Sequence, residues 1–337
     1  MPGAYSGRHP MTTELPAVLA VDGGNSKTDV ALVSADGTLL ALVTGPTVSH
    51  QQVGLRRGMS RLRELAEQAA REAGLNGVDG PLASVLAACL AGADFPRDIR
   101  RLTRAVDSLR LADEAIIRND GFATLRAGTD RRWGVAVICG SGINCVGVAA
   151  DGRSASYPAV GEIAGDWGGG RSLGDAALAA AVRGRDGRGP RTSLELAVPA
   201  HFGLRRPIDV TGALYGSRLE EERLRDLAPA VFQAASAGDP VAREIIDRLA
   251  DEAAVMATAM IRRLRLVRTD VEVILGGAIF RATDPAFYER LTSGITRVAT
   301  AAVVRRLSAR PVLGAALLGL DRVGSPVSAA DRLRASF

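Results

Sequence analysis

Residues 19–33 read LAVDGGNSKTDVALV, and the fold follows from this stretch. An apolar run enters a glycine-rich turn, and a second run of aliphatic and β-branched residues, 30–33, leaves the turn directly. Asp36-Gly37 then begins another turn before the apolar residues 39–43. We therefore predict a strand, a glycine loop, a second strand, an Asp-Gly hairpin and a third strand.

The glycine loop carries groups that suit a phosphate and a metal ion. Glycine backbone can approach a ligand closely, so successive N–H groups can point at one anion. The side chains of Ser26, Lys27 and Thr28 add donors, and Asp22 at the end of the first strand could hold a hydrated cation. A phosphate and magnesium site is one interpretation of this stretch, and an ordinary tight hairpin is the other.

The two commonest phosphate-binding motifs do not describe these loops. A P-loop requires G-x-x-x-x-G-K-[ST] at the start of a helix, and the sequence contains no such string. A dinucleotide fingerprint requires G-x-G-x-x-G between a strand and a helix. In residues 140–145, GSGINC, cysteine replaces the third glycine, and strand-like residues follow.

The opening pattern occurs a second time. Residues 135–139 predict a strand, residues 140–144 a glycine loop, residues 145–149 another strand, and Asp151-Gly152 repeats the hairpin turn. Such an internal repeat predicts two similar α/β halves that face each other. Each half would direct its glycine loop into the cleft between them.

A third glycine-rich stretch, residues 161–170 (GEIAGDWGGG), suits a loop folded against a polar ligand, although a flexible connector is the alternative. Apolar periodicity predicts the remaining helices and strands. The predicted helices are 53–73, 97–109, 122–127, 175–183, 193–201, 219–237, 240–265, 287–306 and a last one beginning near 314; the predicted strands are 82–90, 114–118, 271–279 and 311–313.

Composition narrows the classes of protein that fit. The chain has 337 residues and a formal net charge of +5, which raises the question of nucleic-acid binding. Its arginines, however, are spread along predicted helices without the aromatic side chains that stack on bases, so no nucleic-acid partner is expected. Lys27 in the glycine loop is the only lysine.

The sequence also bears on location and metals. No apolar run approaches the ~20 residues of a membrane span, so no membrane partner is expected. Residues 1–14 lack the apolar segment of a signal peptide and are predicted to be a disordered tail, with Met11 as an alternative start; we expect a cytoplasmic protein. The three cysteines form no C-x-x-C pair, and the three histidines are far apart, which makes a zinc site improbable.

Three glycine loops, a strand-end aspartate and a Gly-Gly turn after a late strand resemble the sugar kinase/Hsp70/actin superfamily of ATP-binding folds. Residues 22–28, 139–145 and 161–166 look like the BadF/BadG/BcrA/BcrD-type ATPase family, and its closest branch contains N-acetylglucosamine kinase and bacterial glucosamine kinases. The resemblance covers about residues 17–319. It implies an α/β fold with two RNase H-like (actin/hexokinase-type) domains and a ligand cleft between them. The implied N-terminal domain is 15–118 plus 312–325, and the C-terminal domain is 119–311 with helical insertions.

The resemblance also implies roles for individual residues. It implies an ATP- and Mg²⁺-dependent kinase that phosphorylates the 6-hydroxyl of an amino sugar, with Asp120 as general base and Asp22 near magnesium; a homodimer is left open. The ATP phosphates would meet Gly23, Gly24, Asn25, Ser26, Lys27, Thr28, Ser141, Gly142 and Asn144. The adenosine would meet Gly238, Asp239, Gly276 and Gly277. The sugar would meet Ser49, His50, Asn119, Asp120, Gly140, Ser141, Gly161, Glu162 and Asp166.

Two departures from the family pattern bear on the sugar. Val160 stands where the kinase that accepts the acetylated sugar has tryptophan, and Glu162 stands where that branch has histidine. An acidic loop without an aromatic wall suits a free ammonium group, so glucosamine is the expected substrate and N-acetylglucosamine the alternative. A non-kinase ATPase that activates a dehydratase through a shared iron–sulfur cluster is the alternative from another class. Cys139 and Cys145 fall on strands around a phosphate loop, which is badly placed for such a cluster.

Overall fold

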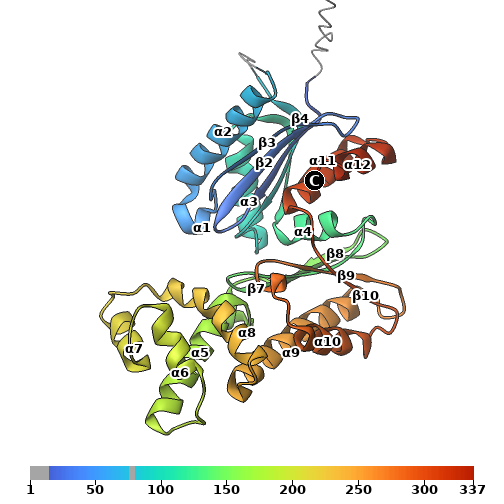
Figure 1. The fold of residues 1–337 in the computed structure, drawn as a ribbon. Coiled ribbons are helices and arrows are strands. Elements are labelled where there is room, and N and C mark those ends of the chain that lie inside the picture. The colour runs from blue at the N-terminus through green and yellow to red at the C-terminus, as the bar shows by residue number, and fades with distance from the viewer. Residues whose placement is uncertain (1–14, 76–79) are drawn as a thin grey trace, which may run out of the picture.

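The computed structural model describes residues 15–75 and 80–337, so the predicted tail lies outside the described residues. The strands form two five-stranded sheets (Figure 1). The first sheet has the order β3-β2-β1-β4-β5, in which β1 pairs antiparallel with β2 and parallel with β4. Its strands are β1 (Val18–Gly23), β2 (Lys27–Val33), β3 (Leu39–Pro46), β4 (Ala83–Leu90) and β5 (Ala112–Asn119).

The second sheet repeats this plan. Its order is β10-β9-β6-β7-β8, in which β6 pairs antiparallel with β7 and parallel with β9. The two predicted strand–loop–strand units are therefore confirmed as the first hairpin of each sheet, and the expected α/β fold with two similar halves is confirmed. The strands are β6 (Gly134–Cys139), β7 (Ile143–Val148), β8 (Ser154–Ser156), β9 (Glu272–Gly276) and β10 (Val303–Arg306).

Helices cover both faces of the first sheet. The apolar side of α2, including Leu62 and Leu65, closes a core against β1, β2 and β4. The opposite face is covered by α11, which packs on β1, β4 and α4, so the C-terminal segment returns to the first sheet (Figure 1). The elements concerned are α1 (His50–Val53), α2 (Leu55–Glu72), α3 (Pro96–Asp107), α4 (Gly121–Gly128), α11 (Pro311–Val323) and α12 (Val327–Arg334).

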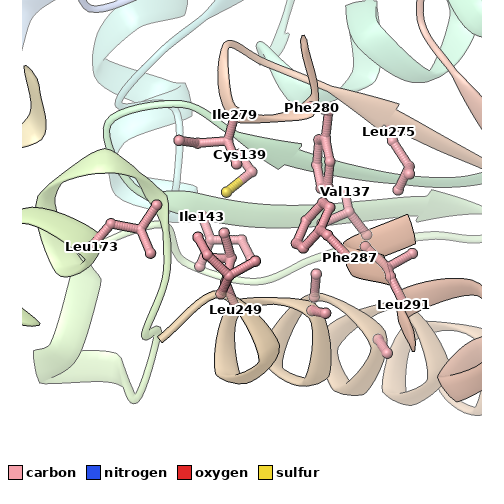
Figure 2. Close-up of a cluster of buried hydrophobic side chains, with 14 of the residues drawn as sticks. Val137, Cys139, Ile143, Leu173, Leu249, Leu275, Ile279, Phe280, Phe287 and Leu291 are labelled. Carbon is pink, nitrogen blue, oxygen red and sulfur yellow. The ribbon is translucent and has the colours of Figure 1, made fainter. Parts of the chain in front are cut away.

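The second sheet buries its core against the long helix α9. Leu249 of α9 belongs to the same buried cluster as Val137, Ile143 and Phe287, and Figure 2 shows it beside Ile143. Three further helices, α5 to α7, extend away from this sheet (Figure 1). The elements are α5 (Gly169–Asp186), α6 (Leu194–His201), α7 (Pro207–Tyr215), α8 (Ala228–Ser236), α9 (Pro240–Arg263) and α10 (Pro285–Thr296), with 3-10 turns at Gly161–Ala164, Glu221–Leu227 and Ile279–Arg281.

Several element predictions were wrong near the C-terminus. The predicted helix 287–306 ends at Thr296, and Val303–Arg306 instead forms the edge strand β10 because the free edge of β9 pairs with it. The predicted strand 311–313 is the first turn of α11, where Pro311 occupies a position that needs no N–H donor. The predicted helix 219–237 is interrupted before α8, which begins with a proline in its first turn. The helices α7 and α12 were not predicted.

Among residues 15–75 and 80–337, no helix is both long enough and apolar enough to cross a membrane.

Candidate active site

Two cavities meet between the sheets. The first, which we call the central cavity, has a volume of about 310 Å³ and is lined by the β1–β2 loop, the β6–β7 loop and the ends of β4 and β5. The second, the outer cavity, has a volume of about 850 Å³ and lies between α8 and residues 278–284. Ser26, Gly140 and Ser141 line both cavities. The two glycine loops therefore form the boundary between the smaller central cavity and the larger outer cavity.

Most of the residues predicted to bind phosphate line the central cavity, and the others only support the loop. Gly24, Asn25, Ser26, Lys27, Ser141, Gly142 and Asn144 line the central cavity, whereas Gly23 and Thr28 do not. The Thr28 hydroxyl is buried and accepts a hydrogen bond from the Val48 N–H at 3.0 Å. The Lys27 ammonium donates to Asp29 at 2.8 Å. Thr28 thus stabilises the loop, while the charge of Lys27 is shared with a neighbouring carboxylate.

The second loop is held by the start of α5. The N–H groups of Gly170 and Arg171 donate to the carbonyls of Gly140 and Ser141 at 2.8 and 2.9 Å. Gly169 has φ +82°, and a Cβ there would lie 2.5 Å from Ser141 O and Gly142 Cα. The glycines at 168–170, which we expected in a ligand loop, therefore pack against the phosphate loop and begin a helix.

Three carboxylates face the central cavity from the ends of neighbouring parallel strands: Asp22 near the end of β1, Asp94 beyond β4 and Asp120 after β5. Burial, reinforced by the charges of Asp120 and Asp29, raises the pKa of Asp22 to about 8. Burial and the charge of Asp94 raise the pKa of Asp120 to about 6. Burial therefore disfavours the ionised form of these two carboxyl groups. Either they bind protons, or a nearby cation stabilises their negative charge.

This environment fits a magnesium ion. Across residues 15–75 and 80–337, no group of three or more His, Cys, Asp or Glu side chains could hold a metal by itself. Mg²⁺ commonly binds one or two carboxylates and completes its octahedron with phosphate oxygens and water. Asp22, buried beside Asp120 and next to the phosphate loop, is a residue that could hold such an ion.

Asn119 connects the two sheets. Its Oδ1 accepts hydrogen bonds from the Gly121 N–H at 2.9 Å and from Asn144 Nδ2 at 3.0 Å, and its Nδ2 donates to Asp94 at 2.9 Å. Asn119 is only 3% exposed. Asn119 therefore caps α4 while the adjacent Asp120 makes no side-chain capping bond and lines the cavity.

Only some of the remaining residues predicted to bind the sugar line the central cavity. Gly161 lines the central cavity, whereas Glu162 in the following 3-10 turn is exposed and does not. Asp166 has a buried Oδ2 without a hydrogen-bond partner. Ser49 is buried, donates to Asn25 Oδ1 at 2.9 Å and, like His50, is not among the cavity-lining residues.

None of the four predicted adenosine residues lines the outer cavity, although two of them lie next to it in the sequence. Gly276 and Gly277 directly precede the lining residues Ala278 and Ile279. Gly277 has φ +103°, and a Cβ there would lie 2.3 Å from Cys139 O. Gly238 and Asp239 do not line the cavity, which is instead bordered by α8 residues such as Phe232, Gln233 and Ser236.

We did not predict from the sequence that Asp94 lines the central cavity or that residues of α8 line the outer cavity. Asp94 comes shortly after the buried strand β4, much as Asp120 comes directly after β5, so its position beyond a strand end was a usable signal. The α8 residues carry no such signal, because only the packing of α8 on α9 brings them to the cavity.

The Asp239 side chain accepts hydrogen bonds that stabilise the start of α9. It caps α9 by accepting from the N–H groups of Val241 and Ala242, and it also accepts from Thr192 and Ser193. Burial acts to raise its pKa, but these hydrogen bonds outweigh burial and lower the pKa to about 2. The stabilisation is thus present above about pH 4 and lost as pH falls through about 2.

Asp239→Ala is expected to lower the free energy of unfolding by about 2–4 kcal/mol, because the variant leaves several buried donors without an acceptor. Urea denaturation at pH 7 measures the change. Asp209→Ala, which removes a more exposed carboxylate from the first turn of α7, is the control and should have a much smaller effect. Unchanged stability together with a raised KM for ATP would instead support direct nucleotide binding by Asp239.

Comparison with known proteins identifies the class. Residues 19–319 match the BadF/BadG/BcrA/BcrD ATPase family, and the chain belongs to this family. It is 30% identical over 266 residues to an N-acetylmuramic acid/N-acetylglucosamine kinase from Clostridium acetobutylicum, covering 78% of this chain and 85% of that protein. It is 26% identical over 312 residues to N-acetyl-D-glucosamine kinase from Dictyostelium discoideum, covering 90% and 97%.

A solved structure has the same architecture. The chain superposes on a candidate N-acetylglucosamine kinase from Chromobacterium violaceum with a TM-score of 0.71 and 25% identity, covering 91% of this chain and 99% of that one. This similarity confirms the predicted two-domain fold of the sugar-kinase type.

Proposed function

We propose that this protein transfers the γ-phosphoryl group of ATP to the 6-hydroxyl of an amino sugar. The observation that carries the proposal is the junction of the two cavities at Ser26, Gly140 and Ser141. ATP would occupy the outer cavity, with its base beside α8 and its terminal phosphates at the two loops. The sugar would occupy the central cavity, which contains Asp120.

The residues of the central cavity suit in-line phosphoryl transfer, which depends mainly on positioning and charge stabilisation. Asp120 would orient the sugar hydroxyl and accept its proton. The β1–β2 and β6–β7 loops would direct N–H and hydroxyl groups at the phosphates. Mg²⁺ held by Asp22 would neutralise phosphate charge. Asp166 does not line the central cavity, so no sugar contact is assigned to it.

The nitrogen substituent of the sugar separates two candidates. The expectation of glucosamine depended on the acidic residues Glu162 and Asp166 and on Val160 in place of an aromatic wall, and none of these side chains lines the cavity. Two relatives are named as kinases of N-acetylated amino sugars. We therefore favour N-acetylglucosamine, and glucosamine remains the second candidate because Asp94 and Asp120 leave the central cavity acidic.

The dehydratase-activator alternative receives less support. Cys89, Cys139 and Cys145 are at most 1% exposed. Burial raises the pKa of the Cys139 thiol to about 12 and that of Cys145 further. A cluster shared between subunits needs accessible thiolates, and these side chains lie in the core.

ADP release assayed with Mg²⁺ and a panel of sugars tests the proposal. We expect release to depend on an amino sugar, with kcat/KM for N-acetylglucosamine at least about tenfold above that for glucosamine, because a cavity shaped for one substituent discriminates by about 1–3 kcal/mol. Glucose serves as the control that lacks nitrogen. ATP hydrolysis that no sugar stimulates would contradict the kinase proposal, and a preference for glucosamine would reverse only the choice of substituent.

A further inference from the structure

Asp94 lines the central cavity but has no part in the mechanism above. It lies in the segment between β4 and α3 and is partly buried. Its Oδ1 accepts a hydrogen bond from Asn119 Nδ2 at 2.9 Å. The Gln51 side chain and the Ala159 backbone N–H lie near this carboxylate and favour its ionised form, and both residues line the same cavity. One carboxylate therefore faces donor groups from three separate segments.

These donors come from both halves of the molecule. Gln51 belongs to α1 and Asn119 to the end of β5, both in the half built on the first sheet. Ala159 follows β8 of the second sheet and, like Gly161, lines the central cavity. Asn119 in turn accepts from Asn144 of β7. The hydrogen bonds Asp94–Asn119–Asn144 thus run from the first sheet to the second, and Ala159, from the segment after β8, lies beside Asp94 at the start of this chain.

The chain of hydrogen bonds also passes the proposed base. Asp120 directly follows Asn119, and the Asn119 side chain holds the first N–H of α4 through Gly121. A shift of Asn119 would therefore move Asp120. A shift of Ala159 would move Gly161 and the 3-10 turn that follows it.

We propose that Asp94 is a positioning residue that holds the 159–161 segment and Asp120 in one arrangement around the sugar. The proposal rests on the proposed kinase function and names a residue that determines sugar affinity and the exclusion of water. A carboxylate suits this position because it only accepts hydrogen bonds, Asn119 donates to it, and Gln51 and Ala159 present donor groups beside it. The outer cavity does not include Asp94, so nucleotide binding should not depend on it.

The test is Asp94→Asn, a substitution of nearly equal size that places an NH₂ group against the donors. We expect kcat/KM for the sugar to fall about 10–100-fold, with a higher KM from the displaced 159–161 segment and a lower kcat from the displaced Asp120. The dissociation constant for ATP measured without sugar should stay within about twofold. The ratio of ADP formed to sugar phosphate formed should rise above one, because a loosened segment admits water to the γ-phosphate.

Asp98→Asn is the matched control. It removes a carboxylate from the first turn of α3, four positions further along, outside the central cavity. Its sugar kinetics and its ADP-to-product ratio should stay near those of the wild type.

Two results would overturn the role of Asp94. One is an Asp94→Asn variant with unchanged sugar KM and unchanged ADP-to-product ratio. The other is equal weakening of sugar and ATP binding with a large fall in Tm, which would assign Asp94 to general stability. Failure of the wild type to phosphorylate any sugar would instead overturn the proposed function.

Discussion

Asp120→Asn is expected to lower kcat by about 10²–10⁴ while leaving ATP affinity nearly unchanged, because the amide cannot accept the proton of the sugar hydroxyl. Asp120 is separated from the outer cavity, and its neighbour Asn119 provides the cap of α4, so the fold does not depend on its charge. Steady-state kinetics and equilibrium nucleotide binding measure the two quantities.

The pH profile provides a second measurement of the same role. Burial and the charge of Asp94 raise the pKa of Asp120 to about 6, so the proportion of ionised base falls below that pH. The value of kcat/KM should decrease as pH falls through about 6, and more Mg²⁺ should move this limb to lower pH by favouring the carboxylate.

Asp113→Asn is the control, since it removes an exposed carboxylate from the same strand, β5, and should leave kcat unchanged. An Asp120→Asn variant that retains more than about a tenth of wild-type kcat would assign the general base to another residue.

Asp22→Asn is expected to have opposite effects on activity and stability. Loss of the carboxylate that would hold Mg²⁺ should lower kcat by about 10²–10³, since metal stabilisation of transition-state charge contributes several kcal/mol. The ligand-free protein should become more stable by on the order of 2 kcal/mol near pH 7. Burial raises the pKa of Asp22 to about 8, so ionisation of this carboxylate costs folding free energy as pH rises from about 4 towards 8.

Asp29 offers a matched comparison because it lies directly opposite Asp22 in the β1–β2 pairing. Burial acts to raise its pKa, but hydrogen bonds from Lys27, Thr44 and Arg310 outweigh burial and lower it. Asp29→Asn should therefore lower Tm, whereas Asp22→Asn should raise it. Magnesium titrations of activity and thermal unfolding of the ligand-free proteins measure both effects. A lower Tm for Asp22→Asn, or an unchanged magnesium dependence, would contradict the assignment of Asp22.

Local sequence alone determined the hairpins, the glycine loops and the strand-end aspartates. An apolar run, a glycine turn and a second apolar run form an antiparallel pair from adjacent residues, so each unit can be recognised without its neighbours. Asp22 and Asp120 could be predicted because a side chain that follows a buried strand lies at a defined sheet edge. The repeat of the unit then implied two similar halves.

Tertiary structure alone decided which distant segments complete the cavities. Val303–Arg306 became a strand because β9 offered an unpaired edge, and 311–323 became a helix because β1 and α4 offered an apolar surface. Packing also brought α8 to the outer cavity and placed Glu162 on the surface, which no local pattern distinguishes from a cavity position. Asp94 acquired its neighbours Asn119, Gln51 and Ala159 only when β5, α1 and the segment after β8 met, because contacts between remote segments depend on the whole fold.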